Sequence, residues 1–256
     1  MASRTGSTLF QHIEELQGDR PWGSFLDAGT GTHSARWMMS LATERWTAVT
    51  GAEGHAVEVR DAVARMRRAG DRLILGNWAD PDLLKGEIYD TVLADYLLGA
   101  IEGFAPYFQE SLFSRLRLLT GRRLYVVGLE PYVSVRPENE GERLIFEIGR
   151  HRDACLMLAG ERPYREYPLV WVVQNLRRSG YRVVASRHFG IRYTDRFVNS
   201  QIDMTVMRLR KLEDRKLAEA LARRGEGLRK AALDMIARQG DIRCGHDYVI
   251  AAEPIG

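Results

Sequence analysis

Cysteine is scarce in this chain of 256 residues, and the two that occur, Cys155 and Cys244, lie far apart. A disulfide framework needs more cysteines than this, and metal sites are built on close cysteine spacings that the chain lacks. We therefore expect free thiols in a reducing compartment, which favours a cytoplasmic protein.

Long apolar runs and a strong charge of either sign are also absent. No uncharged apolar segment approaches the roughly 18 residues of a membrane span, and the N-terminal segment lacks the basic and apolar regions of a signal peptide. The formal net charge is only +3, with 28% of the residues charged in mixed sign, so nothing demands a nucleic-acid partner. The six histidines lack paired ligand spacing, so we expect neither a membrane protein nor a metal site.

What the chain does have is a short apolar strand that runs into a glycine turn, in the sequence SFLDAGTGTHS at residues 24–34. Asp27 ends the strand, Gly29, Thr30 and Gly31 form the turn, and helical character follows. Glycines one residue apart let the backbone turn tightly and approach a ligand, and the helix directs its N-terminal N–H groups into the same space. The segment predicts a nucleotide-binding corner, with a tight connection that binds nothing as the alternative.

The spacing of the glycines separates the classes of nucleotide. A dinucleotide fingerprint has a third glycine three residues after the second, where this chain has Ser34. An acid followed by G-x-G instead resembles the first motif of the class I S-adenosylmethionine-dependent methyltransferases, usually D-x-G-x-G-x-G, with His33 here at the third glycine. This resemblance implies S-adenosylmethionine as the cofactor. The residues of the motif that would bind it are Asp27, Ala28, Gly29, Thr30 and Gly31.

Two later turns hold the candidates for binding the ribose and the adenine. The acid that commonly meets the ribose in this family is replaced by Thr50, and Glu53 in the next turn is its possible substitute or a solvated glutamate. Asn77 offers an amide to the adenine edge, and Trp78 or its backbone would flank the base. The alternative for this pair is an Asx-type turn with a tryptophan in the core.

Strand and helix patterns alternate along most of the chain, which predicts a parallel sheet with right-handed crossovers. Strands after the first are expected at residues 45–49, 72–75, 89–93, 123–129, 181–186 and 202–209, and helices at 9–16, 35–41, 56–68, 105–119 and 169–179. The last two strands, joined by a loop over residues 188–199, match the antiparallel end of the methyltransferase sheet. We expect an α/β fold: a Rossmann-like, seven-stranded, mostly parallel sheet with an antiparallel last strand and helices on both faces.

A single methyltransferase domain is expected over residues 1–256, with its core at about 22–210. An insertion at about 134–166 breaks the rhythm, and the spacing of its apolar residues predicts a cap helix over 141–159. A C-terminal helical extension is expected at about 211–256. Its parts are helices over residues 211–223 and 226–239 and a last strand over 246–252.

Ligands of parallel sheets bind at the carboxyl ends of the strands. Asp95 follows the fourth strand and is a candidate to bind the cofactor, with a helix N-cap as its alternative. Tyr96 and Tyr132, after the fourth and fifth strands, are candidates to meet the methyl acceptor. His188, in the expected loop, and His151, on the cap helix, are candidate bases because histidine titrates near neutral pH. A packing role for either histidine is the alternative.

Methyl transfer needs little from the protein, because the sulfonium is already an activated leaving group. The enzyme has to align the nucleophile and exclude water. We expect metal-independent transfer to an oxygen, nitrogen or sulfur atom of a small molecule, by a cytoplasmic enzyme for which a homodimer is one option. Two alternatives stay open: methyl transfer to a peptide or RNA, and a non-catalytic protein that binds adenosyl ligands.

Overall fold

The computed structural model describes residues 8–64, 67–133 and 136–256, which divide between two compact units. The first unit comprises Met1–Leu129, Glu166–Phe189 and Asp247–Gly256, and the second comprises Glu130–Arg165 and Gly190–His246. The sheet strands that precede residue 130 all belong to the first unit, and so do the predicted adenosyl-binding residues.

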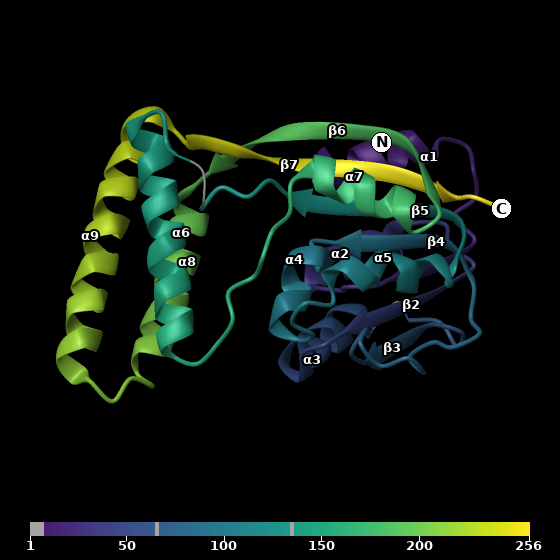
Figure 1. The fold of residues 1–256 in the computed structure, drawn as a ribbon, viewed down its shortest axis with the longest axis horizontal. Coiled ribbons are helices and arrows are strands. Elements are labelled where there is room, and N and C mark those ends of the chain that lie inside the picture. The colour runs from purple at the N-terminus through teal and green to yellow at the C-terminus, as the bar shows by residue number, and fades with distance from the viewer. Residues whose placement is uncertain (1–7, 65–66, 134–135) are drawn as a thin grey trace. The chain divides into compact units, whose positions relative to one another are not determined.

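The described chain forms a seven-stranded sheet in the order β3-β2-β1-β4-β5-β7-β6 (Figure 1). Strands β3, β2, β1, β4 and β5 are parallel neighbours, and β7 runs antiparallel to β5. The bounds are β1 Ser24–Asp27, β2 Arg45–Thr50, β3 Arg72–Leu75, β4 Tyr89–Asp95, β5 Thr120–Leu129, β6 Tyr181–Tyr193 and β7 Ile242–Pro254. The predicted Rossmann-like, mostly parallel sheet with an antiparallel last strand is confirmed.

Helices cover both faces of the sheet because successive side chains of each strand point to opposite sides. Phe25 packs with α1 (Thr8–Gln17), α2 (Thr32–Ser40) and α3 (Glu53–Val63). The next side chain, Leu26, packs in the other cluster. The elements of that second cluster are α4 (Leu97–Ala100), η1 (Ile101–Gly103), α5 (Gln109–Arg117) and α7 (Leu169–Arg178).

The prediction of a strand over residues 202–209 is wrong, because this segment is the second half of α8 (Asp195–Leu209). The apolar residues there fit both a strand and a helix period over so short a stretch. Burial shows which period applies: Val198, Ile202, Thr205 and Leu209 are buried, at spacings of four, three and four. The seventh strand is β7, which contains the segment that was expected as an additional last strand.

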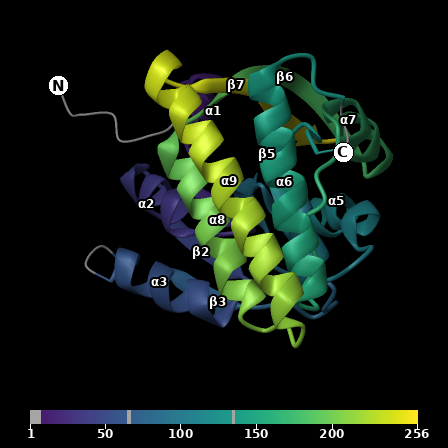
Figure 2. The ribbon, with the colours of Figure 1, turned by 90° about the vertical axis from the view of Figure 1, so that its left-hand side faces the viewer.

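The second unit contains three packed helices, α6 (Glu140–Leu158), α8 and α9 (Arg215–Gln239), which contact one another pairwise (Figure 2). The helix predicted over residues 141–159 is therefore found, as α6. The two helices predicted at the C-terminus are a single helix, α9, that runs through Gly225 and Gly227. At Gly225 the approach of His151 explains the glycine, since an added Cβ would lie 2.8 Å from the imidazole Nε2.

The prediction of a loop over residues 188–199 is also wrong. Strand β6 continues to Tyr193 and α8 begins at Asp195, so His188 lies within a strand. No helix among the described residues is both long and apolar enough to cross a membrane.

Candidate functional site

The glycine turn that follows β1 is hydrogen-bonded to the strands on both sides of β1. The Ala28 N–H donates to the Leu93 carbonyl on β4 at 2.8 Å, and the Thr30 N–H donates to the Val49 carbonyl on β2 at 2.8 Å. These bonds extend the pairing of β1 by a few residues beyond Asp27, where the strand ends. The turn is therefore a rigid part of the sheet edge.

The two glycines of the turn have different neighbours. A Cβ added at Gly29 would lie 3.0 Å from the side chain of Leu97, whereas one added at Gly31 would meet no atom within 4 Å. Gly31 is the N-cap of α2, and its N–H donates to the Ser34 hydroxyl at 3.1 Å. The space beside Gly31 is open at the end of a helix that carries a positive partial charge.

Asp27 is 0% exposed, and its carboxylate is only partly satisfied. Oδ1 accepts a long hydrogen bond of 3.4 Å from the Gly29 N–H, while Oδ2 has no partner among the described residues. Burial raises the pKa of this carboxyl to about 6, while weaker interactions with the Ser34 and Thr30 hydroxyls and the Gly29 N–H act to lower it. Both hydroxyls donate to the Gly31 carbonyl, at 3.3 and 3.4 Å, which leaves Oδ2 without a hydrogen bond. Because an unsatisfied buried oxygen costs free energy, a ligand that donates a hydrogen bond here would stabilise the site.

The register of the sheet brings two further carboxylates to the same face as Asp27. Asp27 lies opposite Leu93, two residues before Asp95 at the end of β4, and side chains two residues apart share a face. Asp247 lies opposite Leu129, two residues beyond the partner of Asp95 on β5. We call Asp27, Asp95 and Asp247 the acidic edge; it lies at the carboxyl ends of the parallel strands.

The electrostatics of the acidic edge disfavour the ionised forms of its three carboxyl groups. Burial and the charges of Asp27 and Asp247 raise the pKa of Asp95 to about 8. Burial raises the pKa of Asp247 to about 6, against a hydrogen bond from the Tyr96 hydroxyl. Among the described residues, no lysine or arginine contributes to these shifts. A cation bound at this edge would stabilise the ionised carboxylates.

Tyr96 is held by its backbone beside the acidic edge. Its N–H donates to the Val127 carbonyl at 3.0 Å, and its φ of 47° lies in the left-handed region, which is uncommon for a bulky residue. Burial and Asp247 raise the pKa of the Tyr96 hydroxyl, so it acts as a hydrogen-bond donor. Tyr96 is itself the N-cap of α4, so the alternative role of Asp95 as the N-cap does not apply.

The predicted ribose-binding residues lie at the end of β2. Thr50 is buried as the last residue of this strand. Glu53 is exposed and begins α3, so it does not lie in the turn where it was expected. The ring of Phe104 packs against Gly51, where an added Cβ would lie 2.9 Å from it. Phe104 thus covers the end of β2.

Asn77 and Trp78 follow β3, and both make the contacts of the predicted alternative. The Asn77 side chain accepts from the Ala79 N–H at 3.0 Å, as in an Asx-type turn, and donates to the Phe104 carbonyl at 2.8 Å. The Trp78 indole is buried and donates to the Ala28 carbonyl at 2.7 Å. Its ring is thereby placed in the core, so a role in flanking adenine is left to its backbone.

The remaining candidates lie elsewhere in the two units. His188 is exposed on β6, and its ring lies edge-on to that of Tyr248, with 6.4 Å between the ring centroids. In the second unit, the Tyr132 hydroxyl accepts from Arg152 at 3.0 Å, and His151 is buried 3.8 Å from the Cys155 Sγ. Burial and the charge of Arg224 lower the pKa of His151, as is typical of a packing histidine.

Asp247 and Phe104 are the functional candidates that the sequence analysis missed. Asp247 was assigned to an additional strand beyond the methyltransferase sheet. Recognition that HDYVIAA is the antiparallel seventh strand would have placed its first residues at the carboxyl edge, since β7 runs opposite to β5. Nothing in the local sequence marks Phe104, because its contact with Gly51 joins segments more than fifty residues apart.

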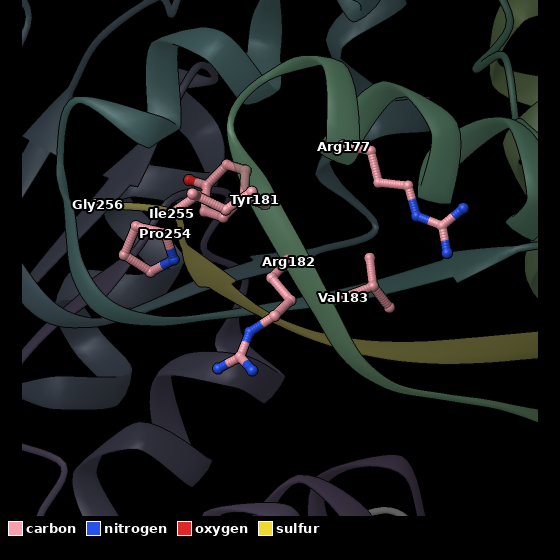
Figure 3. A pocket seen from close by; sticks show the side chains of 7 residues that line it. All are labelled: Arg177, Tyr181, Arg182, Val183, Pro254, Ile255 and Gly256. Carbon is pink, nitrogen blue, oxygen red and sulfur yellow. The ribbon is translucent and has the colours of Figure 1, made fainter.

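A cavity of about 600 Å³ opens at the other edge of the sheet. Its lining residues come from α7, the start of β6 and the end of β7 (Figure 3). They are Arg177, Tyr181, Arg182, Val183, Pro254, Ile255 and Gly256. Arg182 is paired there with Glu253, and none of the candidate residues takes part in this cavity.

Comparison with known proteins identifies the fold. No family model matches the sequence, and neither does any curated protein. An inferred methyltransferase from Bacillus halodurans C-125 is similar in structure, with a TM-score of 0.64 at 13% identity over 98% of this chain and 100% of that chain. A mycolic acid cyclopropane synthase complexed with S-adenosylhomocysteine has a TM-score of 0.54 at 16% identity, over 95% of this chain and 83% of that one.

The cyclase SpnF is also similar, with a TM-score of 0.55 at 14% identity over 96% of this chain and 80% of that chain. These likenesses extend over nearly the whole chain, and the strand order agrees with them. The chain has the fold of the class I S-adenosylmethionine-dependent methyltransferases.

Proposed function

We propose that this protein binds S-adenosylmethionine and transfers its methyl group to an oxygen, nitrogen or sulfur atom of a small molecule. The observation that carries the proposal is the unpartnered, buried Oδ2 of Asp27, beside the open turn at Gly31. The amino-acid part of the cofactor has an ammonium group that can donate to Asp27, and a carboxylate suited to the N-terminus of α2.

The residues present fit the rest of the cofactor. Thr50 ends β2 and Asn77 follows β3, where the ribose and adenine would lie. The ring of Phe104 packs against Gly51, next to Thr50, and the Phe104 carbonyl accepts from Asn77. The cofactor supplies an electrophilic methyl group when bound. A structural neighbour crystallised with S-adenosylhomocysteine supports this choice of ligand.

The protein's own part is to orient the acceptor and keep water from the methyl group. Tyr96 is the best supported of the residues proposed to meet the acceptor, because it follows β4 beside Asp95. His188, His151 and Tyr132 stay candidates. The negative acidic edge argues against RNA as the acceptor, because phosphates are repelled by carboxylates.

The substitution Gly31→Val tests the cofactor site. The open space around Gly31 and its extended backbone, with φ of −122°, accommodate a valine in the folded protein. The added side chain would occupy the place of the ligand, so the affinity for S-adenosylhomocysteine should fall by about 100-fold or more, measured by isothermal titration calorimetry.

Gly190→Val is the matched control, since a Cβ there also meets no atom within 4 Å. It should leave the affinity unchanged. Equal affinities for both folded variants would contradict the proposed site.

A second candidate function is the binding of adenosyl ligands without methyl transfer. Thr50 stands where the ribose-binding acid of the family is expected, and one structural neighbour is a cyclase. Incubation with S-adenosylmethionine labelled in the methyl group, against a pool of metabolites, separates the two functions. Tight binding of S-adenosylhomocysteine without labelled product would favour the second.

A further inference from the structure

We propose that Asp95 and Asp247 bind the protonated amino group of the methyl acceptor, so that the substrate is a small primary or secondary amine. This inference rests on the proposed methyl transfer and narrows the acceptor atom to nitrogen.

The two carboxylates lie at the same edge and on the same face of the sheet. Asp95 ends β4 and Asp247 lies on β7, on one face of the sheet, with the partner strand β5 between them. The Tyr96 hydroxyl interacts with the carboxyl group of Asp247 and lowers its pKa. Asp95 accepts no hydrogen bond from the described residues. Both groups belong to the first unit.

The acidic edge has three carboxylates, whereas the cofactor brings one ammonium group. The buried Oδ2 of Asp27 lacks a donor, and the charge of Asp27 acts directly on Asp95, so this oxygen belongs to the same cluster. The ammonium of the cofactor can satisfy Asp27, while the cofactor's own carboxylate is bound elsewhere. Asp95 and Asp247 are then left without a cation, at an edge where no described lysine or arginine shifts their pKa values.

The surroundings add one more acidic side chain, that of Glu166. The carboxylate of Glu166 lies against Gly99, where any Cβ would overlap it, and its charge also acts on Tyr96. Apart from the pair itself, the carboxylates whose charge acts on the groups of this edge are therefore those of Asp27 on Asp95 and of Glu166 on Tyr96. Among the described residues, no three acidic, histidine or cysteine side chains are arranged to hold a metal ion. The cation that fits is an organic one.

The reaction balances with these groups. The bound ammonium gives one proton to a carboxylate of the pair, and the neutral nitrogen attacks the methyl carbon with its lone pair. The carbon–sulfur bond breaks, and its electrons pass to the sulfur, which leaves as the neutral thioether. The methylated ammonium keeps one positive charge, and the carboxylate later releases its proton to water. One proton is released for each methyl group transferred.

The test is a titration with n-butylammonium, and with 1-butanol as its neutral counterpart, in the presence of saturating S-adenosylhomocysteine. The wild-type protein should bind the ammonium and not the alcohol. Asp95→Asn and Asp247→Asn should each weaken this binding about tenfold, and Asp247→Asn should change the affinity for S-adenosylhomocysteine by less than twofold. Asp82→Asn, at an exposed carboxylate paired with Lys85, is the control and should change neither.

A second measurement uses the labelled methyl donor with a panel of primary and secondary amines and the matching alcohols and thiols. Label in the amines alone supports the proposal. Label in alcohols or thiols, equal binding of butanol and butylammonium, or displacement of butylammonium by S-adenosylhomocysteine overturns it. Butylammonium binding that depends on Asp95, with no binding of S-adenosylhomocysteine, would instead overturn the proposed function and retain the cation site.

Discussion

At the scale of single residues, the carboxyl groups of the acidic edge make the stability of the protein depend on pH. The pKa of Asp95 is raised to about 8, and those of Asp27 and Asp247 to about 6. The folded protein therefore binds these protons more tightly than the unfolded chain does. The resulting stabilisation is fully present below the unfolded pKa of 3.8, and it is lost as the pH rises through 6 and 8.

Asp95→Asn should remove much of this loss, because asparagine has nearly the same size and never ionises. We expect the variant to exceed the wild type at pH 8.5 by on the order of 1–2 kcal/mol in the free energy of unfolding, and to differ little at pH 5. Urea denaturation at both pH values measures this. A wild-type stability that rises from pH 5 to 8.5, with an unchanged slope in Asp95→Asn, would contradict the assignment.

At the scale of elements, α9 shows why a helix continues where the sequence suggests a break. Each glycine in a helix interior costs about 1 kcal/mol relative to alanine, so a pair of them favours an end. Helix α9 nevertheless spans 25 residues, because it packs on both α6 and α8. Tertiary packing outweighs the local preference.

Alanine at the two glycines of α9 should have opposite effects. Gly227→Ala meets no atom within 4 Å and should raise the free energy of unfolding by about 1 kcal/mol. Gly225→Ala places its Cβ 2.8 Å from the buried imidazole of His151 and should destabilise the helix pair by about 1–3 kcal/mol. Thermal unfolding of the two variants side by side decides the point, and stabilisation by Gly225→Ala would show that His151 moves aside at no cost.

At the scale of the whole molecule, the two compact units predict a local response to the cofactor. All proposed adenosyl-binding residues belong to the first unit. S-adenosylhomocysteine at 100 times its dissociation constant stabilises the state that binds it by about 2.7 kcal/mol. Amide exchange that requires opening of the first unit should therefore slow by about 100-fold.

Hydrogen exchange measured by mass spectrometry locates the effect. We expect slower exchange in β1, β2 and β4 and little change in α6, α8 and α9. Equal slowing in all of these elements would show that the two units open together, contrary to this expectation.

The sequence by itself determined the parallel core of the sheet and the turn from Asp27 to Gly31. Those features depend on local patterns: apolar strands of four to seven residues, and glycines at fixed spacing after an acid. The sequence also placed Asp95 and Tyr96 after the fourth strand, since carboxyl ends of parallel strands share one edge. Local patterns could not assign residues 202–209, where a short apolar segment fits both the strand and the helix period.

Only the tertiary structure decided which residues complete the edge. Asp247 joins Asp95 through the antiparallel pairing of β7 with β5, and these residues are about 150 positions apart in the chain. Trp78 was assigned to the core by a hydrogen bond to Ala28, which no sequence pattern encodes. The chain thus specifies its strands locally, whereas the charge of its site arises from long-range pairing, because carboxylates far apart in sequence raise one another's pKa values only when folding brings them together.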